Sequence, residues 1–422
     1  MRILHVIASA DPRSGGPVAG ILQQDRAFAG HVVSELVTLD APDADFLKAF
    51  PLTVFALGSG AVGQRDRPLL MRYGFSFAYV EWLKQNAVRY DSVIVHGLWN
   101  FATMAAALVL PVVMKDRYYV YTHGMMDPWF AKHDPKKHFF KRLSWIAFEG
   151  RLLSRARAVL FTAPDEQELA KGQFWGGGYN GVVVGYGVAE PPQSRPEDSV
   201  AFHETLPALS GRRFLLFLSR INPKKGCDLL VSAFAQVAAD HDFDLVIAGP
   251  DEMGLVKGLR ALASELGVSE RIHWPGMLQG SAKWGAYREA EAFILPSHQE
   301  NFGVVIAEAM ACGLPVLTTN KVNIWREVEA SEGGIIRNDD EQGVVELLRS
   351  WLALSDGQKR KMAESARRGF DRQFSAHYVA ERFLNLLSDH GVEGALEAAS
   401  AVSQNSPSEA GSRPASVTTE SR

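Results

Sequence analysis

Residues 214–248 read FLLFLSRINPKKGCDLLVSAFAQVAADHDFDLVIA, and this stretch decides the fold class. The apolar runs Phe214–Ser219 and Phe243–Ala248 each predict a buried strand. Between them we predict a helix over Cys227–Ala239, because apolar residues recur there at helical spacing. That apolar stripe consists of Leu229, Leu230, Phe234 and Val237. Strands that are apolar throughout and joined by a helix are typical of a parallel sheet covered on both faces, so we predict an α/β fold.

The same alternation extends in both directions along the chain. Upstream, strands are predicted at Arg2–Ala8, Ser34–Leu39, Leu52–Leu57, Ser92–His96, Tyr118–Thr122 and Ala158–Thr162. Downstream, they are predicted at Ile272–Trp274, Ala292–Leu295, Pro315–Thr318 and Gly334–Ile336. Helical patterns lie between most of these strands, including Gly20–Ala29, Phe75–Val88, Lys137–Ser154 and Glu252–Leu266. Two such series predict two Rossmann-like domains with parallel sheets.

A proline-rich segment separates the two series. Residues 190–199 read EPPQSRPEDS, a composition that predicts a linker. We therefore predict an N-terminal domain over residues 1–189 and a C-terminal domain over residues 200–372. The pattern at Ser375–Leu387 predicts an amphipathic helix. Residues 391–422 lack core-forming side chains and are predicted to be disordered.

The composition narrows the class of protein. Hydrophobic residues make up 47% of the chain, charged residues make up 22%, and the net charge is −4, which argues against a nucleic-acid-binding protein. The two cysteines, Cys227 and Cys312, are too few for a disulfide framework and are typical of a reducing compartment. The first residues lack the pattern of a signal peptide, and the apolar run Phe101–Met114 is shorter than the roughly 20 residues that span a bilayer. We expect a cytoplasmic protein, either soluble or peripheral to the inner face of the cytoplasmic membrane.

The strongest functional motif is Pro296–Val316, which reads PSHQENFGVVIAEAMACGLPV. A predicted strand ends just before it, Glu300 follows in a loop, and Gly303 begins a helix that holds Glu308. The backbone N–H groups of residues 301–304 would form an anion site at the start of this helix. Carboxylates accept hydrogen bonds from vicinal hydroxyls, as on sugars. A loop acid and a solvated helix acid are the structural alternative, but Glu308 lies in an apolar run.

This motif resembles the hallmark of glycosyltransferase family 4, a large family of retaining enzymes with the GT-B fold. The resemblance rests on the spacing of Glu300 and Glu308, with NFG after the first and AMACGLPV after the second. The stretch Ser219–Gly226, SRINPKKG, is similar to the diphosphate-binding loop of that family. There an Arg and a Lys five residues later bind the donor phosphates, and Arg220 and Lys225 match them. The alternative is that both are surface cations without a role.

Two further loops in the first domain match the family less specifically. The stretch Asp11–Pro17, DPRSGGP, resembles a glycine loop that approaches the donor phosphate, although a plain turn is the alternative. His123, in THGMMDP, matches a His-Gly pair that contacts the donor sugar in related transferases. The alternative is a histidine that caps a helix or lies in the core. His96, in HGLWN, could bind the acceptor or serve the structure equally well.

The resemblance spans about residues 1–390 and assigns roles to the site. It implies that Glu308 binds the ribose, that Glu300 orients the transferred sugar, and that the helix at 375–390 packs back on the N-terminal domain. The implied catalytic residues are Glu300, His123, Arg220 and Lys225. The implied donor-binding residues are Gly15, Gly16, Arg220, Lys225, Glu300, Asn301, Phe302, Gly303, Val304 and Glu308. Retention of configuration is expected without a covalent nucleophile, with the departing phosphate taking the acceptor proton.

No cofactor or metal is expected. The pairs Asp43–Asp45 and Asp242–Asp244 match the Asp-x-Asp pattern that holds a divalent metal in another transferase fold, but their contexts are poor. The basic pair Arg220 and Lys225 can neutralise the donor phosphates instead. A nicotinamide enzyme, suggested by Asp40 after the second strand, lacks the GxGxxG fingerprint.

The predicted activity is sugar transfer from a UDP- or GDP-sugar to a saccharide acceptor, in cell-surface polysaccharide assembly. A non-catalytic sugar-nucleotide-binding subunit, an epimerase and a phosphorylase remain as alternatives. The stretch Lys132–Arg157 carries eight Lys and Arg against two acidic residues. Phe139, Leu143, Ile146 and Leu153 share one predicted helical face there, flanked by Phe140, Trp145 and Phe148. That face either packs into the core or, with Phe140 and Trp145 exposed, lies on an anionic membrane that holds a polyprenyl-diphosphate-linked acceptor.

Overall fold

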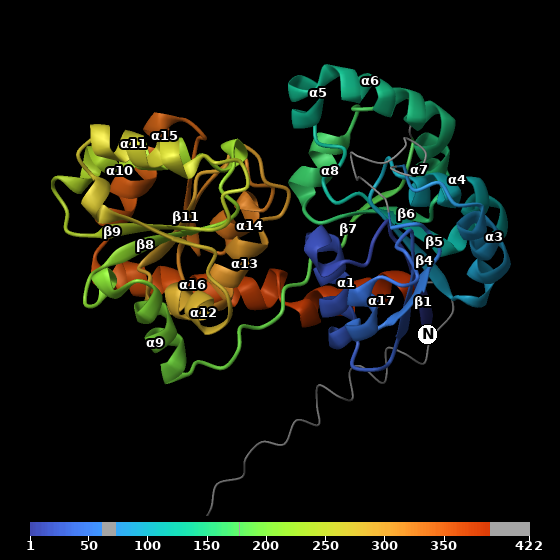
Figure 1. Ribbon diagram of the computed structural model, residues 1–422, viewed down its shortest axis with the longest axis horizontal. Coiled ribbons are helices and arrows are strands. Elements are labelled where there is room, and N and C mark those ends of the chain that lie inside the picture. Colours follow the sequence, from blue (N-terminus) through green and yellow to red (C-terminus); the bar gives the residue numbers. More distant parts are fainter. Residues whose placement is uncertain (61–72, 177, 389–422) are drawn as a thin grey trace, which may run out of the picture. The chain divides into compact units, whose positions relative to one another are not determined.

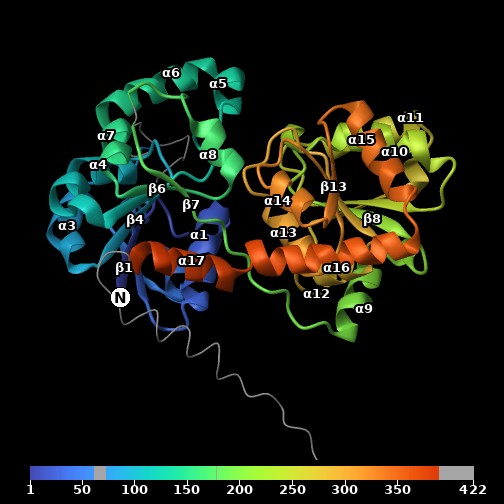
Figure 2. The same cartoon turned by 180° about the vertical axis from the view of Figure 1, so that it is seen from behind.

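The computed structural model describes residues 1–60, 73–176 and 178–388. Residues Met1–Ala380 form one compact unit, and the described residues 381–388 lie outside it. Within the first unit lie two parallel sheets, each flanked by helices (Figures 1 and 2), which confirms the predicted fold class. The segment predicted to be disordered, 391–422, lies outside the described residues.

The first sheet has the order β3-β2-β1-β4-β5-β6-β7 in the described part of the chain. Its strands are β1 (Arg2–Val6), β2 (Val33–Thr38), β3 (Thr53–Ala56), β4 (Ser92–His96), β5 (Tyr118–Tyr121), β6 (Ala158–Phe161) and β7 (Gly181–Val183). Its α-helices are α1 (Gly16–Ala27), α3 (Phe77–Asn86), α4 (Phe101–Val113), α5 (Trp129–His133), α6 (Pro135–Ser144), α7 (Gly150–Arg155) and α8 (Pro164–Ala170). Short 3₁₀ turns are η1 (Pro12–Ser14), η2 (Asp45–Ala49), η3 (Ala87–Arg89) and η4 (Lys115–Arg117), and η5 (Trp145–Glu149) is a π-helix.

The second sheet has the order β10-β9-β8-β11-β12-β13. Its strands are β8 (Phe214–Leu218), β9 (Asp244–Ala248), β10 (Ile272–Gly276), β11 (Ala292–Leu295), β12 (Val316–Thr319) and β13 (Gly334–Arg337). The α-helices after β7 in the chain are α9 (Pro196–Thr205), α10 (Cys227–Ala238), α11 (Val256–Glu265), α12 (Gly280–Glu289), α13 (Val304–Ala311), α14 (Trp325–Ala330), α15 (Glu341–Leu352), α16 (Asp356–Gln373) and α17 (Ala376–Ser388). The 3₁₀ turns are η6 (Pro207–Leu209), η7 (Pro223–Lys225) and η8 (Ser269–Arg271).

The strand order reverses at one point in each sheet. In the first sheet the reversal lies between β1 and β4, and in the second it lies between β8 and β11. Ligands of open parallel sheets bind outside the carboxyl ends of the strands at such points. The loops that follow β1, β4, β5, β8 and β11 carry the motifs identified from the sequence. The topology therefore brings those motifs to the edges where ligands bind.

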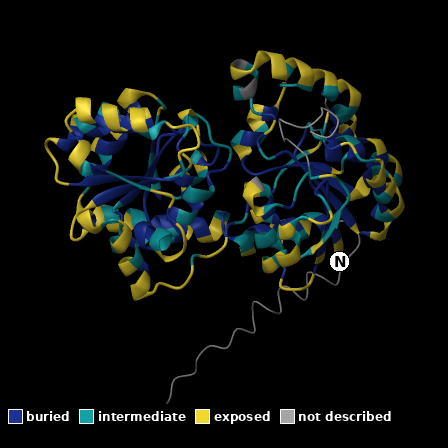
Figure 3. Ribbon diagram, viewed as in Figure 1, coloured by how far each residue is buried: buried dark blue, intermediate teal, exposed yellow. Residues whose placement is uncertain are grey.

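The strands form the buried centre of each sheet domain, as the dark blue ribbons in Figure 3 show. Helix α4 also belongs to the core, although its sequence pattern predicted only an apolar run. It is apolar on most sides, so no helical periodicity is visible in the sequence. The side chain of Asn100 caps its first turn by accepting from the Thr103 N–H at 3.1 Å.

The predicted linker is shorter than the proline-rich composition indicated. Helix α9 begins at Pro196, and the Asp198 carboxylate accepts from the Arg195 N–H at 3.2 Å. Proline suits the first turn of a helix because its missing N–H would have no partner there. Strand β7, only three residues long, was not predicted. The domain limits at 189 and 200 stay predictions.

The start of α17 contacts the segment after β7. The Val188 N–H donates to Phe374 O at 2.8 Å, and the Ala376 N–H donates to Val188 O at 2.9 Å. The side chain of Val379 approaches Gly185. These contacts lie within Met1–Ala380, so the packing of the whole predicted helix 375–390 stays a prediction.

The basic stretch around α6 differs from the single amphipathic helix that was predicted. Phe139, Leu143 and Ile146 are exposed, whereas Leu153 from the same predicted face is buried. Trp145, which was expected to be exposed on a membrane-bound helix, is buried. The predicted face is divided because the wider turn of the π-helix η5 changes the helical phase between α6 and α7. Among the described residues, no helix combines the length and apolar character needed to cross a membrane.

Candidate donor-binding and catalytic site

A cavity of about 940 Å³ lies at the carboxyl ends of strands from both sheets. Nine residues that the resemblance assigned to the site line it: Gly16, His123, Arg220, Lys225, Glu300, Asn301, Phe302, Gly303 and Val304. Gly15 and Glu308 are not among its lining residues. The fold therefore brings together most of the predicted site, while the roles of the individual residues stay predictions.

The loop after β8 presents two cations to this cavity. The Asn222 side chain accepts from the Lys224 N–H at 3.1 Å and shapes the turn. Gly226 ends the loop with a φ of 63°, and a Cβ there would lie 2.2 Å from Pro296 O, so only glycine fits. Lys225 is buried, and its ammonium group forms an ion pair with the Glu300 carboxylate. Arg220 is exposed and lies 3.8 Å from Glu252.

The loop with Glu300 is fixed by the loop that follows β12. The Glu300 N–H donates to Lys321 O at 3.0 Å, and the Asn323 N–H donates to Glu300 O at 3.0 Å. Gly303, with a φ of 78°, is the N-cap of α13. The start of α13 therefore opens on the cavity, where the first N–H groups of a helix favour an anion.

Glu308 is held by two side chains that the sequence did not single out. Its carboxylate accepts from Lys283 Nζ at 2.7 Å and from the Tyr287 hydroxyl at 3.1 Å. Lys283 lines the cavity, whereas Glu308 is not among its lining residues. The carboxylate predicted to bind ribose is therefore already paired with two side chains. Burial, and secondly the Glu308 charge, raise the pKa of Tyr287 well above its ordinary value. A lysine one helical turn before the tyrosine of α12 is the only sequence signal for this arrangement.

The loop that carries His123 depends on a buried carboxylate, Glu166. It accepts from the Gly124 N–H at 2.6 Å and from Thr122 Oγ1 at 2.7 Å. It also accepts from the N–H and the hydroxyl of Thr162, at 2.8 and 2.6 Å. These bonds hold His123 at a φ of 50°, a conformation that costs about 1–3 kcal/mol for a residue other than glycine. The sequence analysis missed Glu166, and only a Glu four residues after a predicted strand signals it.

His96 contacts His123 and therefore belongs to the same part of the site. Its Nδ1 lies 3.0 Å from His123 Nε2, and its Nε2 lies 2.9 Å from Nδ1 of His5 on β1. The His123 ring stacks on Tyr121, with ring centroids 4.6 Å apart. His96 and His123 also line a second cavity, so the two possible roles of His96 are compatible.

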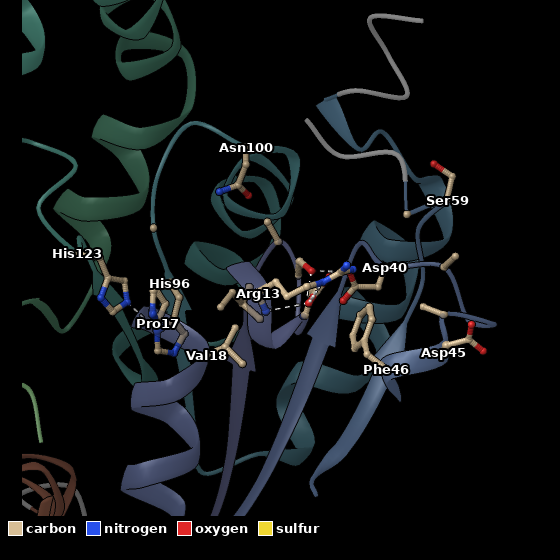
Figure 4. Close-up of a pocket in the computed structure, with 18 of the residues that line it drawn as sticks. Arg13, Pro17, Val18, Asp40, Asp45, Phe46, Ser59, His96, Asn100 and His123 are labelled. Atoms are coloured by element: carbon tan, nitrogen blue, oxygen red, sulfur yellow. Dashed lines mark hydrogen bonds and ion pairs between the residues drawn. The ribbon is translucent and has the colours of Figure 1, made fainter. Parts of the chain in front are cut away.

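This second cavity, of about 930 Å³, lies wholly in the first sheet domain (Figure 4). His96 and His123 lie beside each other on one side of it, away from Asp40 and Asp45. Asp40 accepts from Ser9 Oγ at 2.6 Å and from the Ala10 N–H at 2.7 Å, so it fixes the loop after β1. The cavity is large enough for a saccharide of a few rings.

The loop after β1 has the glycine geometry that a close approach requires. Gly15 has a φ of 103° and a ψ of −157°, a region open almost only to glycine. Gly16 begins α1, and its carbonyl accepts from the Tyr186 hydroxyl at 2.6 Å. Arg13, in the same loop, binds the Asp11 carboxylate at 2.7 Å. Hydrogen bonds at Asp11 and Gly16 thus hold this loop, although Gly15 itself does not line the 940 Å³ cavity.

Both Asp-x-Asp pairs contact basic side chains. Arg212 binds Asp242 at 3.2 Å and Asp244 at 2.7 Å, and Asp45 binds Lys48 at 2.8 Å. Within the described residues, no three His, Cys, Asp or Glu side chains converge as metal ligands would. Metal independence nevertheless stays a prediction.

Residues 200–369 match the family described as glycosyl transferases group 1. This match agrees with the resemblance that the sequence motifs indicated. A D-inositol 3-phosphate glycosyltransferase from Thermomonospora curvata is 37% identical over 132 residues, which cover 29% of this chain and 30% of that protein. The chain spans about half the length of the curated relatives it matches.

Solved structures with the same fold extend over both sheets. Sucrose-phosphate synthase from Thermosynechococcus elongatus is 18% identical, with a TM-score of 0.69 over 92% of this chain and 99% of that chain. HepE from Anabaena, solved in complex with UDP and glucose, is 20% identical, with a TM-score of 0.69 over 92% of this chain and 100% of that chain. These similarities show the GT-B fold, which consists of two Rossmann-like domains.

Proposed function

We propose that the protein is a retaining glycosyltransferase that moves a sugar from a UDP- or GDP-sugar to a saccharide acceptor. The observation that carries this proposal is the composition of the 940 Å³ cavity. It joins cations for a diphosphate, Arg220 and Lys225, to a carboxylate and an imidazole for a sugar, Glu300 and His123. HepE, which shares the fold, was solved with UDP and glucose, and this supports a nucleotide-sugar donor.

The pairing of the cavity carboxylates supports a mechanism without a covalent nucleophile. Among the described lining residues the carboxylates are Glu252 and Glu300, and each faces a cation, Arg220 or Lys225. A paired carboxylate is a weaker nucleophile and a weaker base than a free one. The departing phosphate therefore takes the acceptor proton, while the two cations and the start of α13 stabilise its charge.

The donor is tested by thermal shift with UDP-, GDP- and ADP-sugars. A ligand present at 100 times its Kd adds roughly 2.7 kcal/mol to the apparent stability. We expect stabilisation by a UDP- or GDP-sugar, followed by transfer with retained anomeric configuration in the NMR spectrum of the product. Stabilisation without hydrolysis or transfer would favour a binding subunit, and turnover with phosphate but no nucleotide would favour a phosphorylase.

We further propose that the acceptor is linked to a polyprenyl diphosphate and that the enzyme works at an anionic membrane surface. The support comes from the α6 surface, which consists of Lys136, Lys137, Phe139, Phe140, Leu143 and Ile146. Its four apolar side chains are between 50% and 71% exposed. Apolar side chains at i, i+1 and i+4 beside two lysines form the pattern of a helix that lies in a lipid interface. Each lysine near anionic lipid adds about 1 kcal/mol of attraction.

The alternative is a soluble acceptor, and it is considered because D-inositol 3-phosphate glycosyltransferases match part of this chain. Co-sedimentation with vesicles of phosphatidylglycerol and phosphatidylcholine separates the two acceptor classes. We expect binding that falls with salt and in the double variant Lys136→Glu, Lys137→Glu. The matched control is Arg360→Glu, Lys361→Glu, an exposed basic pair on α16. If the wild type stays in the supernatant at low salt, a soluble acceptor becomes the better proposal.

A further inference from the structure

Three histidines form a continuous hydrogen-bonded chain across three neighbouring strands of the first sheet. His5 lies in β1, His96 is the last residue of β4, and His123 follows β5 by two residues. The order β1-β4-β5 places them side by side, and the two ring contacts measure 2.9 and 3.0 Å. His5 and His96 are almost wholly buried, and of the three histidines only His123 lines the 940 Å³ cavity.

The connectivity of the chain restricts the positions of its protons. Nδ1 of His5 meets Nε2 of His96, and Nδ1 of His96 meets Nε2 of His123. A neutral imidazole has one donor nitrogen and one acceptor nitrogen. If His5 carries its proton on Nδ1, then His96 and His123 must carry theirs on Nδ1 as well. If His123 carries its proton on Nε2, then His96 and His5 must do the same. Any mixed set places two protons or two lone pairs in one contact.

All three rings are neutral at physiological pH. Burial lowers the pKa of His5 to about 3 and that of His123 to about 3. Burial and the neighbouring imidazoles lower the pKa of His96 well below its ordinary value. Burial is the cause of this neutrality, because a charged imidazolium would lose its hydration in the interior.

We infer that His5 and His96 are positioning residues that fix the orientation and tautomer of His123, and through it the way the sugar of the donor is held. This inference rests on the proposed function of His123 as the residue that meets the donor sugar. Nδ1 of His123 is not used by the chain, so it is the nitrogen left for a sugar hydroxyl. The chain makes that nitrogen a donor in one common tautomer and an acceptor in the other. His5 thereby acts on the reaction although it lines neither cavity.

A matched pair of variants at His5 tests the inference. Asn places a polar atom close to the position of imidazole Nδ1, whereas Leu has nearly the same shape as Asn and no polar atom. We expect His5→Leu to lower kcat about tenfold, a loss of about 1.4 kcal/mol of transition-state stabilisation, and His5→Asn to recover most of the loss. The Kd for UDP should stay unchanged in both, because UDP lacks the sugar that meets His123. Val6→Ala, a cavity in the same strand, controls for lost stability and should keep the wild-type kcat.

Ring ¹⁵N NMR of the ligand-free wild type gives a readout that does not depend on activity or on the folding of any variant. We expect one common tautomer for His5, His96 and His123, and a changed or averaged tautomer for His123 in His5→Leu. Mixed tautomers in the wild type, or equal kcat values for His5→Leu and the wild type, would overturn the inference. Absence of both transfer and donor hydrolysis in the wild type would overturn the proposed function instead, and the tautomer result would still stand or fall by itself.

Discussion

The ion pair between Lys225 and Glu300 gives a prediction with opposite signs for its two members. Both side chains lie in the cavity, with 9% and 21% of their surfaces exposed. A diphosphate that binds the Lys225 ammonium has to draw it away from the Glu300 carboxylate. Lys225→Met therefore weakens the binding of UDP, whereas Glu300→Gln strengthens it by removing the competitor and one negative charge.

The magnitudes follow from the strength of a charge-assisted hydrogen bond. Loss of one such bond to the diphosphate costs about 1.5–3 kcal/mol, so Lys225→Met should raise the Kd for UDP roughly 10- to 150-fold. Release of the partly buried pair is worth about 1 kcal/mol, so Glu300→Gln should lower that Kd about fivefold. Transfer should nevertheless fall in Glu300→Gln, because the carboxylate is proposed to orient the sugar.

Isothermal titration calorimetry with UDP measures both effects. Lys321→Met, a half-exposed lysine outside the cavity, is the control and should leave the Kd unchanged. The reasoning is refuted if Glu300→Gln weakens UDP as strongly as Lys225→Met does. Glu300 would then contribute to nucleotide binding rather than compete for the cation.

Three further predictions concern stability and metal. Burial lowers the pKa of His5 and of His123 to about 3, and it lowers the pKa of His96 well below its ordinary value. The free energy that these neutral rings contribute to folding is therefore fully present above pH 6.5 and is lost as the pH falls. The free energy of unfolding, measured with urea, should be lower at pH 5.0 than at pH 7.5 by about 2 kcal/mol for each ring. In His5→Leu this difference between the two pH values should be smaller by the contribution of one ring. Lys283→Met should lower the free energy of unfolding by about 1–2 kcal/mol, since the Glu308 carboxylate then keeps only one hydroxyl partner, and an unmoved urea midpoint would contradict this. Transfer should survive EDTA, and activity lost in chelator and restored by Mn²⁺ would show that a metal is required.

The strands and the loops that carry the motifs could be predicted because their signals are local. The apolar runs Ser92–His96 and Ala292–Leu295 have the same bounds as β4 and β11. A parallel strand is buried on both faces, so its composition alone reveals it. Helix α4 was not predicted as a helix, because a helix that is buried on most sides has no periodic pattern of apolar residues.

The sequence by itself determined the fold class, the diphosphate loop with Lys225 and the helix start after Glu300, because each depends on residues near one another in the chain. Only the tertiary structure decided which strands are neighbours, and therefore that His5, His96 and His123 meet in a row. It also decided that Lys283 occupies Glu308 and that the π-turn η5 leaves the α6 surface exposed. Such contacts depend on the order of strands and the phase of helices, and no short stretch of sequence determines either of these.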